Sequence, residues 1–304
     1  MMQMIHSYKG GRKVVLHFSI LCFVVFGGIH LSSGIIKAST INLYGHESIV
    51  YSDSIETPTS QNQKPRDINE AIGIAIKEQG KFYLDGEAHT EAHIILDTVE
   101  KNGIVKVYTL ASYGAFGFEN GIFTKISGSG AIPTFITFKK NKKSEYTLIK
   151  YQEPLDGSYY VKSIKKIFPK KLWGKVINIK QSDYLELTKQ QEKQAKEYLK
   201  SIHRKAKVTE KYVEKKPVKI DVQASNKLFA VLTKYDTELN NFPDWIGTRE
   251  LIQNGVRYIY ETSQSKSKSG NDMVTFKKTD ENGNIIKVFS YEIIGHEPKL
   301  ISEE

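Results

Sequence analysis

The sequence predicts an α+β protein, in which an N-terminal membrane segment is followed by two small domains that each consist of a helix and an antiparallel sheet. Two observations predict this fold class. Apolar residues at helical spacing are followed by several β-rich runs separated by turn signals. This order, one helix and then a meander of strands, occurs over 67–180 and again over 217–304. A hydrophobic content of 39% with 11% aromatic residues favours folded domains over disorder.

Near the N-terminus, an apolar run without charged residues spans 14–31 and follows Lys9, Arg12 and Lys13. It has about the length of a bilayer-spanning helix, roughly 20 residues, and exceeds the 7–15 residues usual for the core of a signal peptide. The positive flank predicts an N-terminus inside the cell and a C-terminal part outside it. We therefore expect 1–38 to be a single-pass anchor in the cell membrane. The alternative is a cleaved signal, which would leave the protein secreted.

A linker and the first domain are predicted next. Residues 39–66 are rich in Ser, Thr, Gln and Asn, which is typical of a flexible linker. Asp67 and Glu70 form a capping-box pattern, and Gly80 ends the helix that follows. We expect a domain over 67–180. Its predicted strands are 93–99, 104–111, 121–126, 132–138 and 146–151.

Helical patterns continue after these strands. One helical stretch is expected up to residue 168, because Pro169 interrupts it before it resumes over 170–177. A longer helix is predicted over 182–205, with acidic residues in its first turn and basic residues in its last, which suits the helix dipole. We interpret 181–216 as a connector between the two domains.

The second domain, 217–304, is predicted to repeat the layout of the first. A helix is expected over 222–235. Asn282-Gly283 indicates a tight hairpin between the last two predicted strands. The strands of this domain are expected at 255–261, 272–278 and 285–294.

The charge and the cysteine content limit the partners of the chain. The formal net charge is +10 and the isoelectric point is near 9.2, so an anionic lipid or wall polymer is an expected partner, with an ordinary solvated lysine surface as the alternative. No nucleic-acid recognition motif is present, and we expect no nucleic-acid partner. The only cysteine, Cys22, lies inside the apolar run, so no intrachain disulfide can form.

A histidine-rich segment is the candidate metal site. Glu87, His89, Glu91 and His93 would share one face if GEAHTEAH forms a strand, and these are residue types that bind zinc. Same-face neighbours lie about 6.5–7 Å apart in a strand, so one ion could reach two or three of them. A polar, solvent-facing strand surface is the favoured interpretation. We therefore expect no metal and no cofactor.

Three stretches resemble the extracytoplasmic C-terminal region of clostridial BlaR/MecR-type sensor-transducers, the antirepressor metallopeptidase family. They are LASYGAFGFENGIFTKISGSGAIPTFITF (110–138), YQEPLDGSYYVKSIKKIFPKKLW (151–173) and LTKYDTELNNFPDWIGTRELIQNGVRYIYETSQSK (232–266). In that family a membrane-embedded zinc peptidase carries a His-Glu-x-x-His helix. Here His46-Glu47 is followed by Ser48-Ile49-Val50, so the peptidase activity is not carried over. The resemblance implies a sensing region on its own anchor.

Penicillin-binding chemistry in such a sensor would need a Ser-x-x-Lys nucleophile and a Lys-Ser-Gly strand. Ser163 and Lys166 fit the first pattern, and Lys268-Ser269-Gly270 fits the second. Ser163 lies among many lysines, and SQSKSKSG reads as a turn, so both patterns are weak candidates for an acyl-transfer site. Our leading hypothesis is a membrane-anchored, non-catalytic sensing or partner-binding protein. The alternatives are a penicillin-interacting serine acyl-transfer protein and a basic wall- or lipid-binding surface protein.

Overall fold

The computed structural model describes residues 64–211, 213, 221–228, 237–244 and 246–303. The predicted membrane segment and nearly all of the predicted linker lie outside these residues. Within the described part of the chain, no helix is long and apolar enough to cross a membrane. Lys64–Leu155 and the residues from Tyr159 onward belong to one compact unit.

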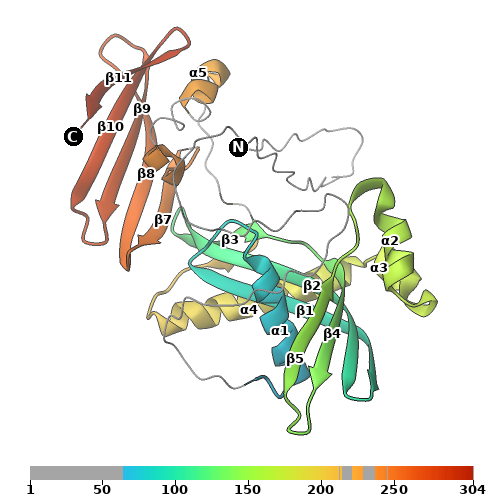
Figure 1. Ribbon diagram of the computed structural model, residues 1–304. Coiled ribbons are helices and arrows are strands. Elements are labelled where there is room, and N and C mark those ends of the chain that lie inside the picture. Colours follow the sequence, from blue (N-terminus) through green and yellow to red (C-terminus); the bar gives the residue numbers. More distant parts are fainter. Residues whose placement is uncertain (1–63, 212, 214–220, 229–236, 245, 304) are drawn as a thin grey trace, which may run out of the picture. The chain divides into compact units, whose positions relative to one another are not determined.

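The structure confirms an α+β fold with a large antiparallel sheet and few helices (Figure 1). β2 pairs with β1, β3 and β4, and β4 pairs with β5, while β7 to β11 form a meander in chain order. A single bridge between Glu119 and Arg249 joins β2 to β7, and β6 pairs with β3 in parallel. The strands are β1 (Ala88–Lys101), β2 (Ile104–Glu119), β3 (Ile122–Gly128), β4 (Ile132–Lys140), β5 (Tyr146–Gln152), β6 (Val208–Thr209), β7 (Gly247–Gln253), β8 (Val256–Lys266), β9 (Asp272–Asp280), β10 (Ile285–Ile294) and β11 (Glu297–Glu303).

The first helix, α1 (Ile68–Gly80), forms where the sequence predicts it. The side chain of Asp67 accepts hydrogen bonds from the backbone N–H groups of the second and third helical residues. Ala71, Ile72, Ala75 and Ile76 are buried against β2 and β4, together with Val105, Val107 and Ile136. Gly80 is required at the end of the helix, because a Cβ atom there would lie 2.1 Å from the ring of Tyr113.

β1 and β2 are longer than the sequence predicts. β1 begins at Ala88 instead of residue 93, and β2 continues to Glu119 instead of ending at residue 111. The second half of β2 is buried on both faces and contains Gly114 and Gly117, so its sequence lacks the alternation of apolar and polar residues that marks a half-exposed strand. Asn102-Gly103, a turn pattern of the kind expected between the strands predicted over 93–99 and 104–111, connects β1 to β2 with positive φ at both residues.

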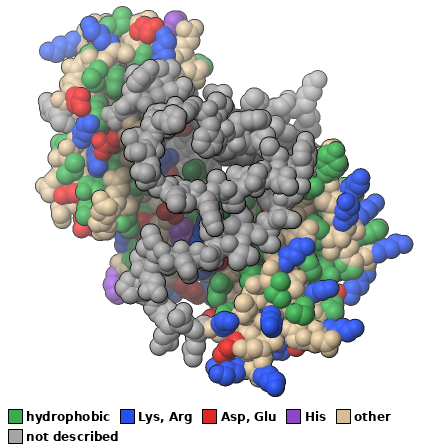
Figure 2. Space-filling view, in the orientation of Figure 1, with side chains coloured by type: hydrophobic (Ala, Val, Ile, Leu, Met, Phe, Trp, Pro, Cys, Tyr) green, Lys and Arg blue, Asp and Glu red, His purple; other side chains and the backbone are tan. Residues whose placement is uncertain are grey.

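The helical stretch that follows β5 is broken at Pro169, as predicted. It consists of η1 (Gly157–Tyr159), α2 (Tyr160–Ile167), η2 (Lys170–Leu172) and α3 (Trp173–Ile177). Every fourth residue is apolar and buried: Ile164, Phe168, Leu172 and Val176 pack with Leu110 of β2. The opposite side of these helices carries lysines, which Figure 2 shows as blue side chains gathered over α2 and α3.

The long helix predicted over 182–205 is α4 (Gln181–Ser201). The sequence suggested a connector, but α4 packs against the first sheet, where Leu187 contacts Leu110 and the α2–α3 core, and Ala195 and Leu199 contact Phe116. Gln190 and Gln194 also bond to the free edge of β1. The backbone N–H of His93 donates to Gln190 at 3.1 Å, and that of Glu91 donates to Gln194 at 3.2 Å. α4 therefore covers an edge that would otherwise be open to another strand.

The C-terminal strands share a separate core around Phe242, whose ring contacts those of Tyr260, Phe276 and Phe289 edge-on. The three predicted strands are present as β8, β9 and β10, and the hairpin at Asn282-Gly283 is confirmed, with a φ of 83° at Gly283. β7 and β11 were not predicted. Of the helix expected over 222–235, the structure shows α5 (Val222–Asn226), and residues 229–235 lie outside the described residues.

Candidate functional site

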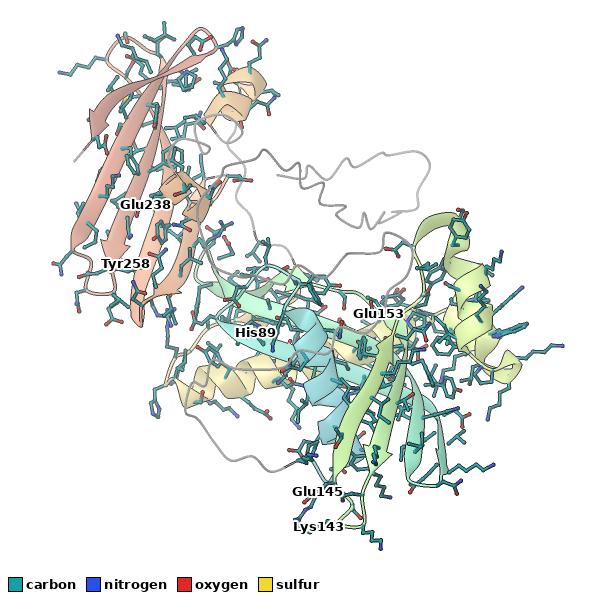
Figure 3. The ribbon with its side chains drawn as sticks, viewed as in Figure 1. His89, Lys143, Glu145, Glu153, Glu238 and Tyr258 are labelled. Carbon is teal, nitrogen blue, oxygen red and sulfur yellow. The ribbon has the colours of Figure 1, made fainter. Side chains whose placement is uncertain are left out.

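The four candidate metal ligands lie on or next to β1, with the alternation that the sequence predicts. The intervening residues Ala88, Thr90 and Ala92 are buried on the other face. His89, labelled in Figure 3, contacts the hydroxyl of Tyr113 through Nδ1 at 2.5 Å and Asp85 through Nε2 at 3.0 Å. Its two ring nitrogens therefore each have a partner outside the candidate set.

The other three candidate ligands also have partners of their own. His93 contacts Glu91 at 2.8 Å through Nδ1 and Asn69 of α1 at 3.2 Å through Nε2. Glu87 is held by Arg257 of β8. Within the described residues, no group of three or more His, Cys, Asp or Glu side chains is arranged to hold a metal ion. The strand face is a hydrogen-bonded polar surface.

Ser163 and Lys166, the acyl-transfer candidates, have different surroundings. Ser163 is buried within α2, where its hydroxyl donates to the carbonyl of Tyr160 at 2.8 Å and accepts from the N–H of Leu155 at 2.9 Å. Lys166 is exposed, and no hydrogen bond joins it to Ser163 in the described residues. The hydroxyl of Ser163 therefore ties the β5–α2 connection to the helix.

The second penicillin-binding pattern, Lys268-Ser269-Gly270, forms the turn between β8 and β9. The hydroxyl of Ser269 donates to Glu292 of β10 at 2.6 Å. Hydrogen bonds from Ser267 and Ser269 lower the pKa of Glu292 to about 2, because they stabilise the carboxylate. In the structure this serine is thus a partner of a surface carboxylate.

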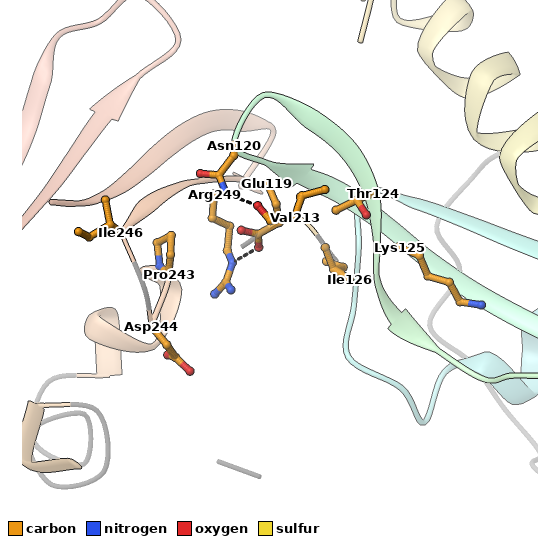
Figure 4. A pocket seen from close by; sticks show the side chains of 10 residues that line it. All are labelled: Glu119, Asn120, Thr124, Lys125, Ile126, Val213, Pro243, Asp244, Ile246 and Arg249. Carbon is orange, nitrogen blue, oxygen red and sulfur yellow. Dashed lines mark hydrogen bonds and ion pairs between the residues drawn. The ribbon is translucent and has the colours of Figure 1, made fainter. Parts of the chain in front are cut away.

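A small polar pocket lies where the end of the β2–β3 hairpin meets residues 243–249 (Figure 4). Its volume is about 110 Å³. Chain segments far apart in sequence contribute to it, and most of its polar lining residues carry a charge. The lining residues are Glu119, Asn120, Thr124, Lys125, Ile126, Val213, Pro243, Asp244, Ile246 and Arg249.

One wall of the pocket is an ion pair. Nε of Arg249 donates to Glu119 at 2.6 Å, and the side chains are 30% and 16% exposed. Burial raises the pKa of Glu119, and the charge and hydrogen bond of Arg249 oppose this rise. A carboxyl group with a raised pKa in a cleft is a feature of functional sites as well as of structural ion pairs.

The other wall carries Lys125. Its ammonium group donates to the carbonyl of Ser129 at 2.9 Å and lies 3.7 Å from Glu210. Burial lowers the pKa of Lys125, since the charged form loses water, and Glu210 opposes this effect. Lys125 is thus a partly dehydrated cation whose ammonium group is directed to Ser129 and Glu210, while Glu119 is a partly dehydrated carboxylate paired with Arg249.

Asn120 holds together the segments that form the pocket. Its Nδ2 donates to the carbonyl of Val213 at 2.7 Å, and its Oδ1 accepts from the N–H of Thr248 at 2.9 Å. Gly247 has a φ of 152°, and a Cβ atom there would lie 2.1 Å from Oδ1 of Asn120. Glycine is therefore the residue that permits this close approach.

A second group of ion pairs lies on the other side of β7. Arg257 donates to Glu87 at 2.6 and 2.7 Å and to Glu250 at 2.9 Å. Arg204 donates to Glu250 at 2.6 and 3.1 Å, and its guanidinium lies 3.8 Å from the ring centroid of Phe118. The hydrogen bond with Glu87 is the main cause of a raised pKa of Arg257. These contacts join β7 and β8 to β1 and α4.

Charged side chains make up most of the polar lining of the pocket. Thr124 supplies the only hydroxyl among the described lining residues, and it donates to the carbonyl of Lys211 at 2.9 Å. These residues include no Ser, Cys or His, so no serine or cysteine nucleophile with a histidine base is found among them. The lining residues present positively and negatively charged groups at fixed positions.

Comparison with known proteins leaves the family open. No family model matches the chain, and no curated protein or solved structure gives a significant match. The sequence had not singled out Glu119, Lys125 or Arg249. The one signal near the pocket is Asn120-Gly121, a turn pattern that precedes the strand predicted over 121–126 and that indicates only a turn between strands.

Proposed function

We propose that this chain is a membrane-anchored extracytoplasmic protein that recognises a ligand or a protein partner without transforming it, and that it is related to BlaR/MecR-type signal transducers. The apolar run at 14–31, with lysine and arginine before it, supports the anchor and its orientation. In this proposal the described residues form two sensing domains outside the membrane, one over 67–180 and one over 217–304.

The observation that carries the recognition role is the charged pocket beside Glu119 and Arg249. Its volume of about 110 Å³ is smaller than the roughly 300–1,000 Å³ of sites for drug-sized ligands. It therefore suits one small charged group, such as a side chain presented by a partner, better than a whole β-lactam. The dehydrated charges that line it would strengthen contacts with such a group.

Cysteine labelling tests the location. The background variant Cys22→Ser removes the natural thiol, and Lys142→Cys adds one on the exposed turn between β4 and β5. We expect a membrane-impermeant maleimide to label this variant in intact cells. Labelling only after lysis would place the domain in the cytoplasm and contradict the proposal.

Recognition at the pocket is tested by thermal unfolding with acetate, methylammonium and glycine, which carry a negative, a positive and both charges. A group that binds only the folded chain raises the unfolding temperature as its concentration rises. We expect one of these probes to do so for the wild type and for the surface control Lys142→Gln, but not for Arg249→Gln. No stabilisation by any of the three would remove the ligand role of the pocket.

Intact mass after incubation with benzylpenicillin separates the proposal from acyl transfer. We expect no covalent adduct, because the hydroxyl of Ser163 is engaged by backbone groups. An adduct that disappears in Ser163→Ala would instead make the protein a penicillin-reactive sensor.

A further inference from the structure

A basic surface on α2, η2 and α3 stands outside the pocket and its ion pairs. We define the basic lobe as residues 159–177. It carries no aspartate or glutamate, and all of its lysines are exposed. Figure 2 shows blue side chains over these elements. The lysines are Lys162, Lys165, Lys166, Lys170, Lys171 and Lys175.

The basic lobe has a net charge of +6, as large as the net charge of the whole chain beyond residue 38. The formal net charge is +10, and residues 1–38 contribute four lysines and arginines and no acid. The remainder therefore carries +6, which equals the contribution of the six lysines of the lobe. Residues 200–219 also carry a net charge of +6, but that segment includes Glu210 and Glu214, whereas the basic lobe contains no acidic residue.

Few of these lysines have a counter-ion. Lys171 pairs with Asp97 of β1 at 2.7 Å, and Lys165 lies over the ring of Trp173 at 5.4 Å. In the described part of the chain, the other four form no ion pair. On α4, by contrast, Lys193 and Lys196 lie within 4.0 Å of glutamates one turn away. The free charges of the lobe therefore remain available to an external anion.

Apolar side chains flank the lysines on the exposed arc of α2. At 100° per residue, Val161 lies at one edge of this arc, and Tyr159 directly precedes the helix; they are 43% and 61% exposed. The opposite side of the lobe is held against β2 by Ile164 and the apolar residues that follow it. A rigid helix with lysines, a valine and a tyrosine outward has the composition of elements that lie at a membrane surface.

We infer that the basic lobe docks on an anionic phospholipid surface. The charge of the lobe is complementary to phosphate head groups, and each lysine near such a surface gains by coulombic attraction. Part of the inference rests on the proposed anchor. The apolar run ends at residue 31 and the described fold begins at residue 64, so the linker would hold the lobe at a high effective concentration near the bilayer.

The test uses the full chain reconstituted in vesicles through its apolar segment. In a Cys22→Ser background, Val161→Cys places one thiol beside the lysines, and an environment-sensitive fluorophore is added from outside. The vesicles contain phosphatidylcholine alone or with phosphatidylglycerol, and both carry a lipid with a quencher in its acyl chain. We expect quenching in the phosphatidylglycerol vesicles, little in the neutral ones, and its loss at high salt because salt screens the charges.

Two quadruple variants with the same change in net charge provide the control. The lobe variant carries Lys→Gln at 162, 166, 170 and 175, and the control carries Lys→Gln at 189, 193, 196 and 200 of α4. We expect the equilibrium constant for docking to fall about five-fold per lysine removed from the lobe, and the control to behave like the wild type. All eight lysines are exposed, so the fold should survive. If the lobe variant does not fold, Lys166→Gln with Lys170→Gln repeats the test.

Three results would overturn the inference: equal quenching in both lipids, equal loss in both quadruple variants, or a fluorophore that responds to soluble polyphosphate but not to phosphatidylglycerol vesicles. The last would assign the lobe to a soluble polyanion. The quenching experiment measures contact between the lobe and lipid in purified vesicles, whereas labelling of Lys142→Cys in cells shows on which side of the membrane the domain lies. Failure of the docking inference is therefore distinguishable from failure of the proposed function.

Discussion

Replacing Arg249 with glutamine isolates the ion pair that forms one wall of the pocket. The guanidinium donates to Glu119 at 2.6 Å and, more weakly, to the carbonyl of Phe242 at 3.4 Å. Glutamine is too short and carries no charge, so Arg249→Gln leaves the carboxylate of Glu119 partly buried without its cation.

The expected loss of stability follows from the burial of the pair. Breaking a fully buried pair costs about 3–5 kcal/mol, whereas exposed pairs contribute about 0–1 kcal/mol. With Glu119 16% and Arg249 30% exposed, an intermediate loss of about 1.5–3 kcal/mol is expected. In a chain of this size that corresponds to a fall in unfolding temperature of roughly 4–10 °C.

The loss should depend on pH in a defined direction. Burial raises the pKa of Glu119 above its ordinary 4.5, so the folded chain binds this proton more tightly than the unfolded chain. Such a group contributes most to stability below 4.5, and its contribution is lost as pH rises through the folded pKa. Removing Arg249 raises that pKa further. Arg249→Gln should therefore be strongly destabilising at neutral pH and only weakly so below 4.5.

Urea unfolding at the two pH values, followed by circular dichroism, measures this difference. The double variant Glu119→Gln with Arg249→Gln is the matched control, since it removes the unpaired carboxylate; it should recover part of the stability and lose the pH dependence. An equal loss at both pH values, or no recovery in the double variant, would refute the view that Glu119 is a dehydrated carboxylate stabilised by Arg249.

Four further variants test local packing. Gly80→Ala should lower the free energy of unfolding by about 1–3 kcal/mol, because the new Cβ atom would collide with the ring of Tyr113. Gly174→Ala has no neighbour within 4 Å and should raise the free energy of unfolding by up to about 1 kcal/mol. Thermal unfolding distinguishes the two variants. Gln190→Ala with Gln194→Ala should cost about 1 kcal/mol per lost bond to the β1 backbone and increase aggregation, measured by light scattering. Ser163→Ala should cost about 1 kcal/mol, measured by urea unfolding, and leave the intact mass after penicillin treatment unchanged.

The sequence was sufficient for elements whose signals are local. The helix α1 is marked by Asp67 at its start and by an apolar residue on every turn, and both features act within the helix itself. β11 lacks such signals: it is an edge strand, nearly all of it exposed, and it contains Pro298. The role of α4 was missed for a related reason, because Gln190 and Gln194 look like solvent-facing residues until the edge of β1 lies beside them.

The candidate site could not be predicted from the sequence, because its contacts join residues that lie far apart in the chain. Glu119 and Arg249 are 130 positions apart, and Glu87 and Arg257 are 170 apart. Glu87 shows the consequence. The sequence grouped it with two histidines on one strand face, whereas in the structure it precedes β1 and its partner is an arginine from β8. Only the folded chain shows which cation satisfies a given carboxylate.

The two groups of ion pairs are coupled through β7. Arg249 and Glu250 are consecutive residues of this strand, so their side chains point to opposite faces. Arg249 holds Glu119 at the pocket, and Glu250 holds Arg204 and Arg257. A group that entered the pocket and drew Arg249 away from Glu119 would remove one of the two side-chain attachments of this strand, while Glu250 would keep the other. If the chain has the proposed recognition function, occupation of the pocket would therefore weaken the attachment of β7 to β2 and leave the contacts of Glu250 in place.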